Sequence, residues 1–342
     1  MAEFYNFYTG TRIKDCFPPV DTSKSYINLY ASGELDARIH ALEDLLTHCS
    51  LCPWKCRVNR TQGEIGICQA GGNLTVAKIL PHFGEEPVLT GKNGSGTIFF
   101  TYCHLRCQFC QNYQISQQHL GSPMSSEQLA DAMISLQEKG CHNINFVSPT
   151  HFLPIIIKAL KIAISKGLTL PLVYNSNGYE RTEILRLLDG IIDIYLPDAK
   201  YGEDKWAQEL SKAKHYTRYN LSTLKEMYRQ VGPLHLNENG IAERGLIIRH
   251  LVLPHDLSGT KEVLMMIKEH IGTKVHISLM GQYFPTYRAH QRKKINRKLT
   301  KEEYRKCLKL LDKYGFENGW YQEPYDIQEE FIPDFTKSAS WN

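Results

Sequence analysis

The stretch "GTIFFTYCHLRCQFC", residues 96–110, joins a run of strand-forming residues to three closely spaced cysteines. Its first part is rich in Ile, Phe, Thr and Tyr, which predicts a short β-strand at residues 96–102. Cys103, Cys107 and Cys110 follow at once, with gaps of three and two residues. The three thiols are therefore expected at the carboxyl end of a strand, where α/β sheets and barrels build their sites.

Helical and extended patterns alternate along the chain after this stretch. Helices are expected at residues 125–140, 153–167, 181–190, 204–213, 221–232 and 260–272. Five more strands are expected at residues 143–149, 170–175, 191–197, 245–254 and 274–280. Such alternation implies parallel strands with helical crossovers. Because six units are fewer than the eight of a closed barrel, the sequence predicts an α/β fold with a partial (β/α)6 barrel of parallel strands. A doubly wound sheet is the alternative.

The chain is expected to have three parts. Residues 1–96 hold an amphipathic helix at 31–47 and a Cys-rich, metal-binding segment of loop-like composition. Residues 97–285 form the partial barrel. Residues 286–342 form a helix at 300–315 and an aromatic, acidic tail that packs on the barrel.

The composition places the chain among ordinary globular proteins. It has 342 residues, 42% of them hydrophobic, and a net charge of +4. Neither a secretory leader nor an uninterrupted run of 18 apolar residues is present, so we expect a cytoplasmic protein without a membrane span. In a reducing compartment, clustered cysteines are metal ligands more often than disulfides. Cys16, Cys141 and Cys307 stand alone and are expected to pack as small apolar residues.

Three thiolates do not close a four-coordinate structural zinc site. Cys103, Cys107 and Cys110 would instead hold three irons of a 4Fe-4S cluster and leave the fourth without a protein ligand. An iron of this kind can bind a substrate or cofactor directly, so the spacing predicts a reactive centre. A zinc site or a coincidental group of thiols is the alternative.

A second group of cysteines precedes the first strand. Cys49, Cys52, Cys56 and Cys68 lie among Gly, Pro and Asn residues. Four thiols in such a loop can close a tetrahedral zinc site or ligate a second iron–sulfur cluster. A loop that buries so few apolar residues of its own needs a bound metal to hold it together. The spacing does not distinguish zinc from iron.

The order of Cys103, Cys107 and Cys110 after the first strand, with Phe109 before the last cysteine, resembles the radical S-adenosylmethionine (SAM) superfamily. The resemblance implies that these cysteines ligate a 4Fe-4S cluster that cleaves SAM to a 5′-deoxyadenosyl radical, which abstracts a hydrogen atom. The stretches "CSLCPWKCRVNRTQGEIGIC", "NINFVSPTHF" and "ISLMGQYFP" resemble relatives of the pyruvate formate-lyase-activating enzymes. A reductant such as flavodoxin or ferredoxin is the implied partner.

The sequence departs from common radical SAM patterns in two places. Ser148, Pro149, Thr150 and His151 stand where many members have a Gly-Gly-Glu stretch that contacts SAM. Ser148 and Thr150 could still accept that hydrogen bond. The four additional cysteines precede the triad, whereas in well-known activases they follow it.

Polar residues at the other strand ends are further candidates for binding SAM or substrate. Asn175 and Asn177 follow the third strand, Asp198 follows the fourth, and Arg249 lies on the fifth. A guanidinium such as that of Arg249 pairs well with a carboxylate. Loops after strands are polar in any case, and Asp198 and Lys200 are also consistent with a structural ion pair.

The basic run "RAHQRKKINRK", residues 288–298, is the last distinctive feature. It could bind RNA phosphates, but it contains no aromatic residue on which a base could stack. A solvated loop or a docking face for an acidic partner is the favoured interpretation.

Three functions follow as hypotheses. The first is a radical SAM oxidoreductase that abstracts hydrogen from a backbone glycine of a partner protein. The second is a radical SAM enzyme that modifies a small molecule or RNA. The third is a non-catalytic iron–sulfur electron carrier, which the three-thiol motif argues against.

Overall fold

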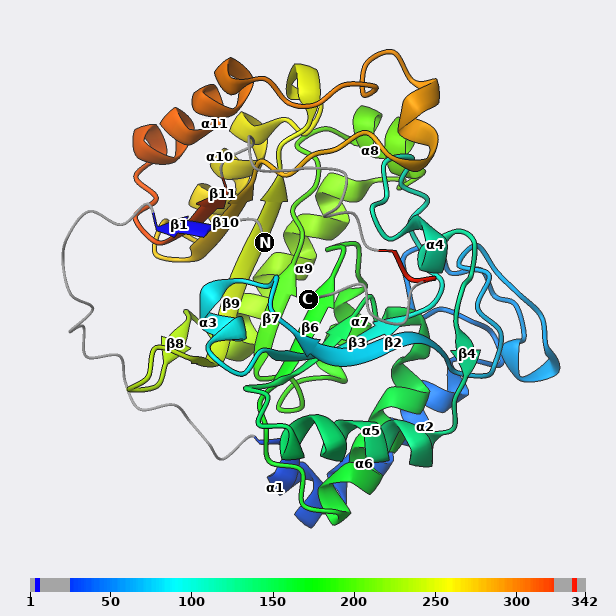
Figure 1. Cartoon of the computed structure of the whole chain (residues 1–342). Coiled ribbons are helices and arrows are strands. Elements are labelled where there is room, and N and C mark those ends of the chain that lie inside the picture. The colour runs from blue at the N-terminus through cyan, green and yellow to red at the C-terminus, as the bar shows by residue number, and fades with distance from the viewer. Residues whose placement is uncertain (1–3, 7–24, 323–333, 337–342) are drawn as a thin grey trace.

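The computed structural model describes residues 4–6, 25–322 and 334–336, and its elements are shown in Figure 1. The strands are β1 (Phe4–Asn6), β2 (Thr75–His82), β3 (Ser95–Phe100), β4 (Ser122–Pro123), β5 (Ile144–Val147), β6 (Leu172–Ser176), β7 (Ile194–Pro197), β8 (His235–Leu236), β9 (Ala242–Leu251), β10 (His276–Met280) and β11 (Gly319–Gln322).

The helices of the described residues lie between these strands. They are α1 (Tyr26–Ala31), α2 (Glu34–Asp44), α3 (Pro87–Thr90), α4 (Tyr113–Ser116), α5 (Ser126–Glu138), α6 (Leu153–Ser165), α7 (Thr182–Arg186), α8 (Asp204–Ser211), α9 (Tyr216–Val231), α10 (Thr260–His270) and α11 (Lys301–Tyr314). None of the described helices is long and apolar enough to cross a membrane.

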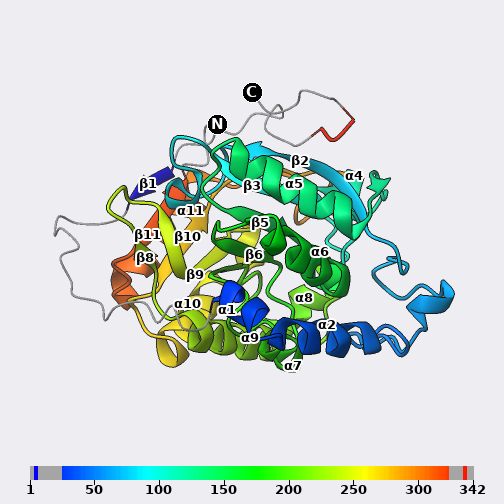
Figure 2. The ribbon, with the colours of Figure 1, turned by 90° about the horizontal axis from the view of Figure 1, so that it is seen from below.

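The strands form one sheet in which β3, β5, β6, β7, β9, β10 and β11 run parallel and lie in chain order. Figure 2 shows these strands as an arc with α5, α6, α7, α9 and α10 around its outside. The six predicted strands and the partial barrel are confirmed. A doubly wound sheet is excluded because the strand order does not reverse anywhere along the parallel run.

Burial explains why the parallel strands form the centre of the molecule. Every residue of β3, β5, β6 and β7 is buried. Strands that are covered on both faces have nearly continuous apolar sequences. The helices cover them with one apolar face each; in α6, for example, Ile156, Ile157 and Leu160 are buried while the Lys158 side chain remains exposed.

Local signals set the helix ends. Ser125 and Gln128 form a capping box at the start of α5, and Gly140 follows the helix with φ +80°. The helix expected at 31–47 is interrupted, because Gly33 adopts φ +76° between α1 and α2. Its apolar face is as predicted, with Leu35, Ile39 and Leu42 buried.

Five of the eleven strands in the described residues were not expected from the sequence: β1, β2, β4, β8 and β11. β2 pairs antiparallel with β3, although its residues lie in the predicted N-terminal part, and β11 adds a seventh parallel strand within the predicted tail. Beyond Gln322 most of the tail lies outside the described residues; of the described ones, Phe335 packs edge-on against Phe99, with ring centroids 5.4 Å apart. The division at residues 96 and 285 stays a prediction.

Candidate active site

A cavity of about 710 Å³ opens at the carboxyl ends of the parallel strands. Its size falls in the range of sites that hold a cofactor or a drug-sized ligand. The cavity is lined by the three clustered thiols, by the ends of β5, β6, β7, β9 and β10, and by residues 81–85, which include the last two residues of β2. The loop after β3 therefore faces the other strand ends across one enclosed space.

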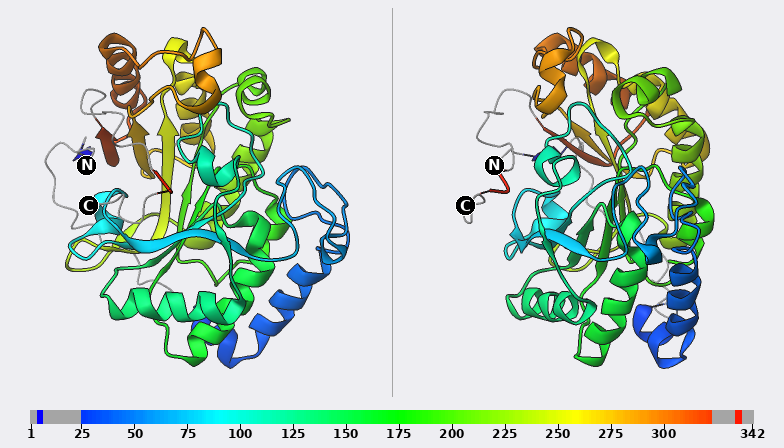
Figure 3. Two further views of the ribbon diagram at one scale, coloured as in Figure 1. Left: turned by 45° about the vertical axis from the view of Figure 1, so that its right-hand side comes forward. Right: turned by 90° about the vertical axis from the view of Figure 1, so that its right-hand side faces the viewer.

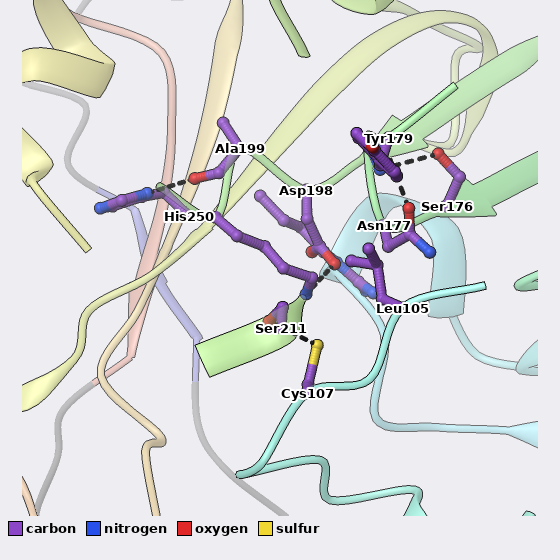
Figure 4. Close-up of polar contacts among 12 residues, drawn as sticks. Leu105, Cys107, Ser176, Asn177, Tyr179, Asp198, Ala199, Ser211 and His250 are labelled. Atoms are coloured by element: carbon purple, nitrogen blue, oxygen red, sulfur yellow. Dashed lines mark hydrogen bonds and ion pairs between the residues drawn. The ribbon is translucent and has the colours of Figure 1, made fainter. Parts of the chain in front are cut away.

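Each thiol of the triad has a hydrogen-bond partner from a different part of the fold. Ser211, the last residue of α8, donates to Cys107 Sγ over 2.9 Å, as Figure 4 shows. Asn177 Nδ2 lies 3.6 Å from Cys103 Sγ, and the Ser116 hydroxyl lies 3.2 Å from Cys110 Sγ. Hydrogen bonds of this kind favour the thiolate form.

The surroundings of the thiols nevertheless oppose ionisation of all three. Burial, followed by the charge of a neighbouring Cys107 thiolate, raises the pKa of Cys103 to about 12 and that of Cys110 to about 11. Burial also raises the pKa of Cys107, although Lys200 and the bond from Ser211 oppose this rise. Thiols that are buried together need a cationic partner before they can all be thiolates, so the donor set fits an iron–sulfur cluster.

Lys200 and Asp198 form an ion pair at the same edge, with Nζ and Oδ2 2.5 Å apart. Burial lowers the pKa of Lys200, but the Asp198 carboxylate and the Cys107 thiolate raise it above the usual value of a lysine. The predicted pair therefore exists, and its cation also faces the thiols. The sequence analysis did not connect Lys200 with the triad.

The structure brings five of the six predicted SAM or substrate contacts to the cavity wall: Ser148, Asn175, Asn177, Asp198 and Arg249. Thr150 lies outside it. Its hydroxyl is fully buried, donates to Glu180 over 2.8 Å and accepts from Tyr174 over 3.1 Å. Burial raises the pKa of Glu180 to about 8, so this carboxyl carries a proton near neutral pH. The roles of all six residues stay predictions, and the placement of Thr150 gives its role no support.

Glu85 and Glu86 are site residues that the sequence analysis missed. The Arg249 guanidinium binds both Glu86 carboxylate oxygens, over 2.8 and 2.6 Å, and also binds Glu85. Asn145 Nδ2 donates to Glu85 over 3.0 Å. Arg249 thus already has two carboxylate partners within the chain. Glu85 and Arg249 line the cavity, and the fully buried Glu86 lies behind them. Two consecutive acidic residues before Pro87 were the only sequence signal.

The second cysteine group lies in the turns between α2 and β2, and Figure 3 shows this segment as a projecting loop at the end of α2. Cys49, Cys52 and Cys68 are buried and Cys56 is half-buried. Burial raises the pKa of Cys52, and the negative charges of the other three thiolates raise it further. The four thiols are therefore close enough to affect one another.

The thiols are not preformed as metal cages. Across the described residues, no three His, Cys, Asp or Glu side chains are already arranged to hold a metal ion.

The accessory cysteine segment, residues 49–68, contacts the triad loop directly. The Trp54 indole N–H donates to the carbonyl oxygen of His104 over 2.8 Å. Arg106 Nη2 donates to the carbonyl oxygen of Ile67 over 2.8 Å. Because His104 and Arg106 neighbour Cys103 and Cys107, the two cysteine groups lie on adjoining loops.

A partial barrel with three thiols after its first parallel strand, facing a ligand-sized cavity, defines an enzyme that can hold a cluster through three protein ligands. Residues 97–237 match the family model described as the radical SAM superfamily. An uncharacterised protein of Methanocaldococcus jannaschii is 34% identical over 293 residues, which cover 83% of this chain and 80% of that protein.

The protein therefore belongs to the radical SAM superfamily, whose members use a 4Fe-4S cluster and SAM for radical chemistry. Membership favours catalysis over the carrier alternative.

Solved structures resemble the chain in part. HydG, a maturase of the FeFe-hydrogenase, is 13% identical with a TM-score of 0.44; the match covers 64% of this chain and 48%, about half, of the HydG chain. Methylornithine synthase (PylB) is 12% identical with a TM-score of 0.43, and the match covers 66% of this chain and 70% of that one.

Proposed function

We propose that Cys103, Cys107 and Cys110 hold the catalytic cluster and that SAM and substrate bind together in the adjoining cavity. The observation that carries this proposal is that the three thiols line the same cavity as Asn175, Asn177 and the other strand-edge residues. When bound, the cluster supplies single electrons and an iron site for SAM, which is cleaved to a radical that takes a hydrogen atom from substrate.

The chain's own residues bind and orient. Lys200, held by Asp198, places a positive charge beside Cys107 and Cys110 and favours their thiolate forms. Asn177 holds its side chain in place by accepting from the backbone N–H of Tyr179 over 3.0 Å, so its amide faces Cys103. The buried wall of the cavity excludes water from a reactive intermediate.

The substrate that we propose first is a backbone glycine of a partner protein. The resemblance of residues 49–68, 143–152 and 277–285 to relatives of the pyruvate formate-lyase-activating enzymes supports this choice. Phe83, an exposed aromatic residue on the cavity lining, offers a contact for a large partner. A glycyl radical would give a characteristic electron paramagnetic resonance doublet on the partner after the reaction.

A small polar molecule is the second candidate. The Glu85–Arg249 pair on the cavity wall, which Glu86 holds from behind, supports it, because a few fixed charges in a concave site orient small ligands. Ultrafiltration of a native extract separates the two candidates: the macromolecular fraction should stimulate SAM cleavage for the first, and the filtrate for the second. RNA would act in the macromolecular fraction and be lost on ribonuclease treatment.

The central test compares the native protein with Cys107→Ala. After anaerobic reconstitution with iron and sulfide, dithionite and SAM should give 5′-deoxyadenosine with the native chain and none with the variant. Cys141→Ala is the matched control, since Cys141 is buried away from the cavity lining. Nucleoside from Cys107→Ala at the native rate would contradict the assignment of the triad.

We also propose that Cys49, Cys52, Cys56 and Cys68 hold a second metal, zinc or iron–sulfur. Their mutual charge effects and the burial of three of them support this. Elemental analysis of Cys52→Ala/Cys68→Ala should show a loss of zinc, or of iron beyond the four atoms of one cluster. In Cys107→Ala, this second metal should remain bound. Equal metal contents in the native chain and in Cys52→Ala/Cys68→Ala would refute the second site.

A further inference from the structure

The basic segment, residues 288–298, has a buried inner side and a charged outer side. Ala289 and Ile295 are fully buried. Residues 290–294 are all exposed, and so is Arg288. The segment is therefore not a loosely solvated loop: two apolar residues fix it to the body of the protein and leave its cations on the outside.

The inner side packs against the triad loop. Ala289 and Ile295 belong to the same apolar cluster as Cys103 and Cys107. Arg292 Nε donates to the side-chain oxygen of Gln108 over 2.6 Å, and Gln108 lies between two of the triad cysteines. The segment is also held by Tyr283, whose hydroxyl donates to the Ile295 carbonyl over 2.6 Å.

The outer side presents positive charge next to this loop. Among the described residues, Lys293 and Lys294 form no ion pair with a carboxylate, whereas Arg297 is bound to Glu303 over 2.7 Å. α8 packs beside the segment, since the Lys294 ammonium lies 4.3 Å from the Trp206 ring centroid, and contributes exposed Lys205. Glu209, whose backbone carbonyl accepts from the Gln108 amide, is the one exposed acidic residue within that helix.

Contacts of the neighbouring aromatic residues argue against binding of RNA to the basic segment. Single-stranded RNA sites combine cations with open aromatic faces on which bases stack. The Trp206 ring is already covered by Lys205, at 4.7 Å, and Lys294. Tyr287 is stacked on Tyr113, with centroids 5.3 Å apart. The aromatic residues beside the basic segment are thus occupied within the chain.

We propose that the outer side of the basic segment is the docking surface for an acidic protein that donates single electrons. This inference rests on the proposed function, since the electron acceptor is the cluster held by the triad. The partner loses one electron and the cluster gains one, and no bond needs to form or break in this step. A donor that docks here lies against the segment that binds Gln108, which stands between Cys107 and Cys110.

Electrostatic docking of this kind has measurable properties. Oppositely charged surfaces speed association by about 10- to 1,000-fold at low salt, and the gain falls as ionic strength rises. Complexes of electron-transfer proteins are small and weak, so steering by charge matters more in them than buried area. Reduction by the partner should depend on the basic segment, whereas reduction by a small inorganic donor should not.

The test uses Lys293→Glu/Lys294→Glu in the reconstituted full chain, with Lys139→Glu/Lys225→Glu as the matched control. Lys139 and Lys225 are exposed, at the end of α5 and on α9. Reduced flavodoxin and reduced ferredoxin serve as probes. Cluster reduction is followed by stopped-flow absorbance and binding by calorimetry, so neither readout needs turnover. The first variant should be reduced at least about 10-fold more slowly at low salt, and the control at the native rate.

The outcomes separate the docking surface from the proposed function. With dithionite, both variants should be reduced and form 5′-deoxyadenosine like the native chain. Equal rates and affinities for the native chain and Lys293→Glu/Lys294→Glu with both probes would overturn the docking surface. Tight binding of single-stranded RNA that is lost in the same variant would overturn it in favour of RNA. Absence of nucleoside from the native chain with dithionite would count against the proposed function and leave the binding result valid.

Discussion

Two buried carboxylates surround the guanidinium of Arg249. Glu86 is fully buried and Glu85 is 6% exposed, while the Arg249 side chain is 14% exposed. Opposite charges in such surroundings depend on one another, because removal of one leaves an uncompensated charge in a poorly solvated place. Burial opposes ionisation of Glu85, but Arg249 and His82 lower its pKa below the usual value. The three side chains therefore form one charged unit, of which Glu85 and Arg249 line the cavity.

Arg249→Met should lower the free energy of unfolding by about 3–5 kcal/mol at pH 7, because two carboxylates lose their counter-ion. In the native chain the lowered pKa of Glu85 stabilises the fold above pH 4.5 and is lost on acidification. In the variant, burial favours the protonated form of Glu85, so the loss of unfolding free energy relative to the native chain should shrink as the pH falls toward 4.5. Urea unfolding at pH 5 and pH 7 measures it. A triple variant with Glu85→Gln and Glu86→Gln should recover most of the loss; no recovery would show that the charges are not the cause.

At the scale of single elements, the loop after β6 and the end of β7 meet at a glycine. Gly178 has φ +70°, and a Cβ built on it would lie 1.9 Å from the Asp198 carbonyl oxygen and 2.4 Å from Asn220 Nδ2. Asn220 Nδ2 donates to the carbonyl oxygens of both Gly178 and Asp198, over 2.9 Å each. This close approach places Asn177 and Asp198 on the cavity wall.

Gly178→Ala should destabilise the protein by about 2–4 kcal/mol, since it adds overpacking to the strain of a positive φ. Gly315→Ala is the matched control: Gly315 has φ +77° at the end of α11, and nothing lies within 4 Å of a Cβ there. That change should cost only about 1 kcal/mol. Thermal unfolding measures the loss of stability, and SAM binding measures the effect on the cavity wall. Equal losses of stability in both variants would mean that backbone strain alone, and not the contact with Asp198, matters at Gly178.

At the scale of the whole molecule, two segments from opposite ends of the chain bind one loop. Trp54 contacts His104, and Arg292 contacts Gln108. Both contacts lie within the triad loop, which is thus enclosed between the accessory cysteine segment and the basic segment. A reactive loop without regular structure is held in place in this way by long-range contacts on both sides.

The sequence by itself determined the six central strands, the helices between them and the group of three thiols. These features are local: the alternation of helical and extended patterns along the chain, and a cysteine spacing within eight residues. β2 and β11 were not expected because neither shows a clear period: in the eight-residue β2 only Val76 is buried, and β11 has only four residues.

Only the tertiary structure decided what surrounds the thiols. Arg249 and Glu86 are 163 residues apart, and Arg292 and Gln108 are 184 apart. The sequence marks each of these residues as polar or charged, but nothing local selects its partner. The Lys200 charge beside Cys107 and the placement of the basic segment arise because parallel strands bring their carboxyl ends to one edge. Glu85 and Glu86 reach Arg249 by another route, since they follow the antiparallel strand β2.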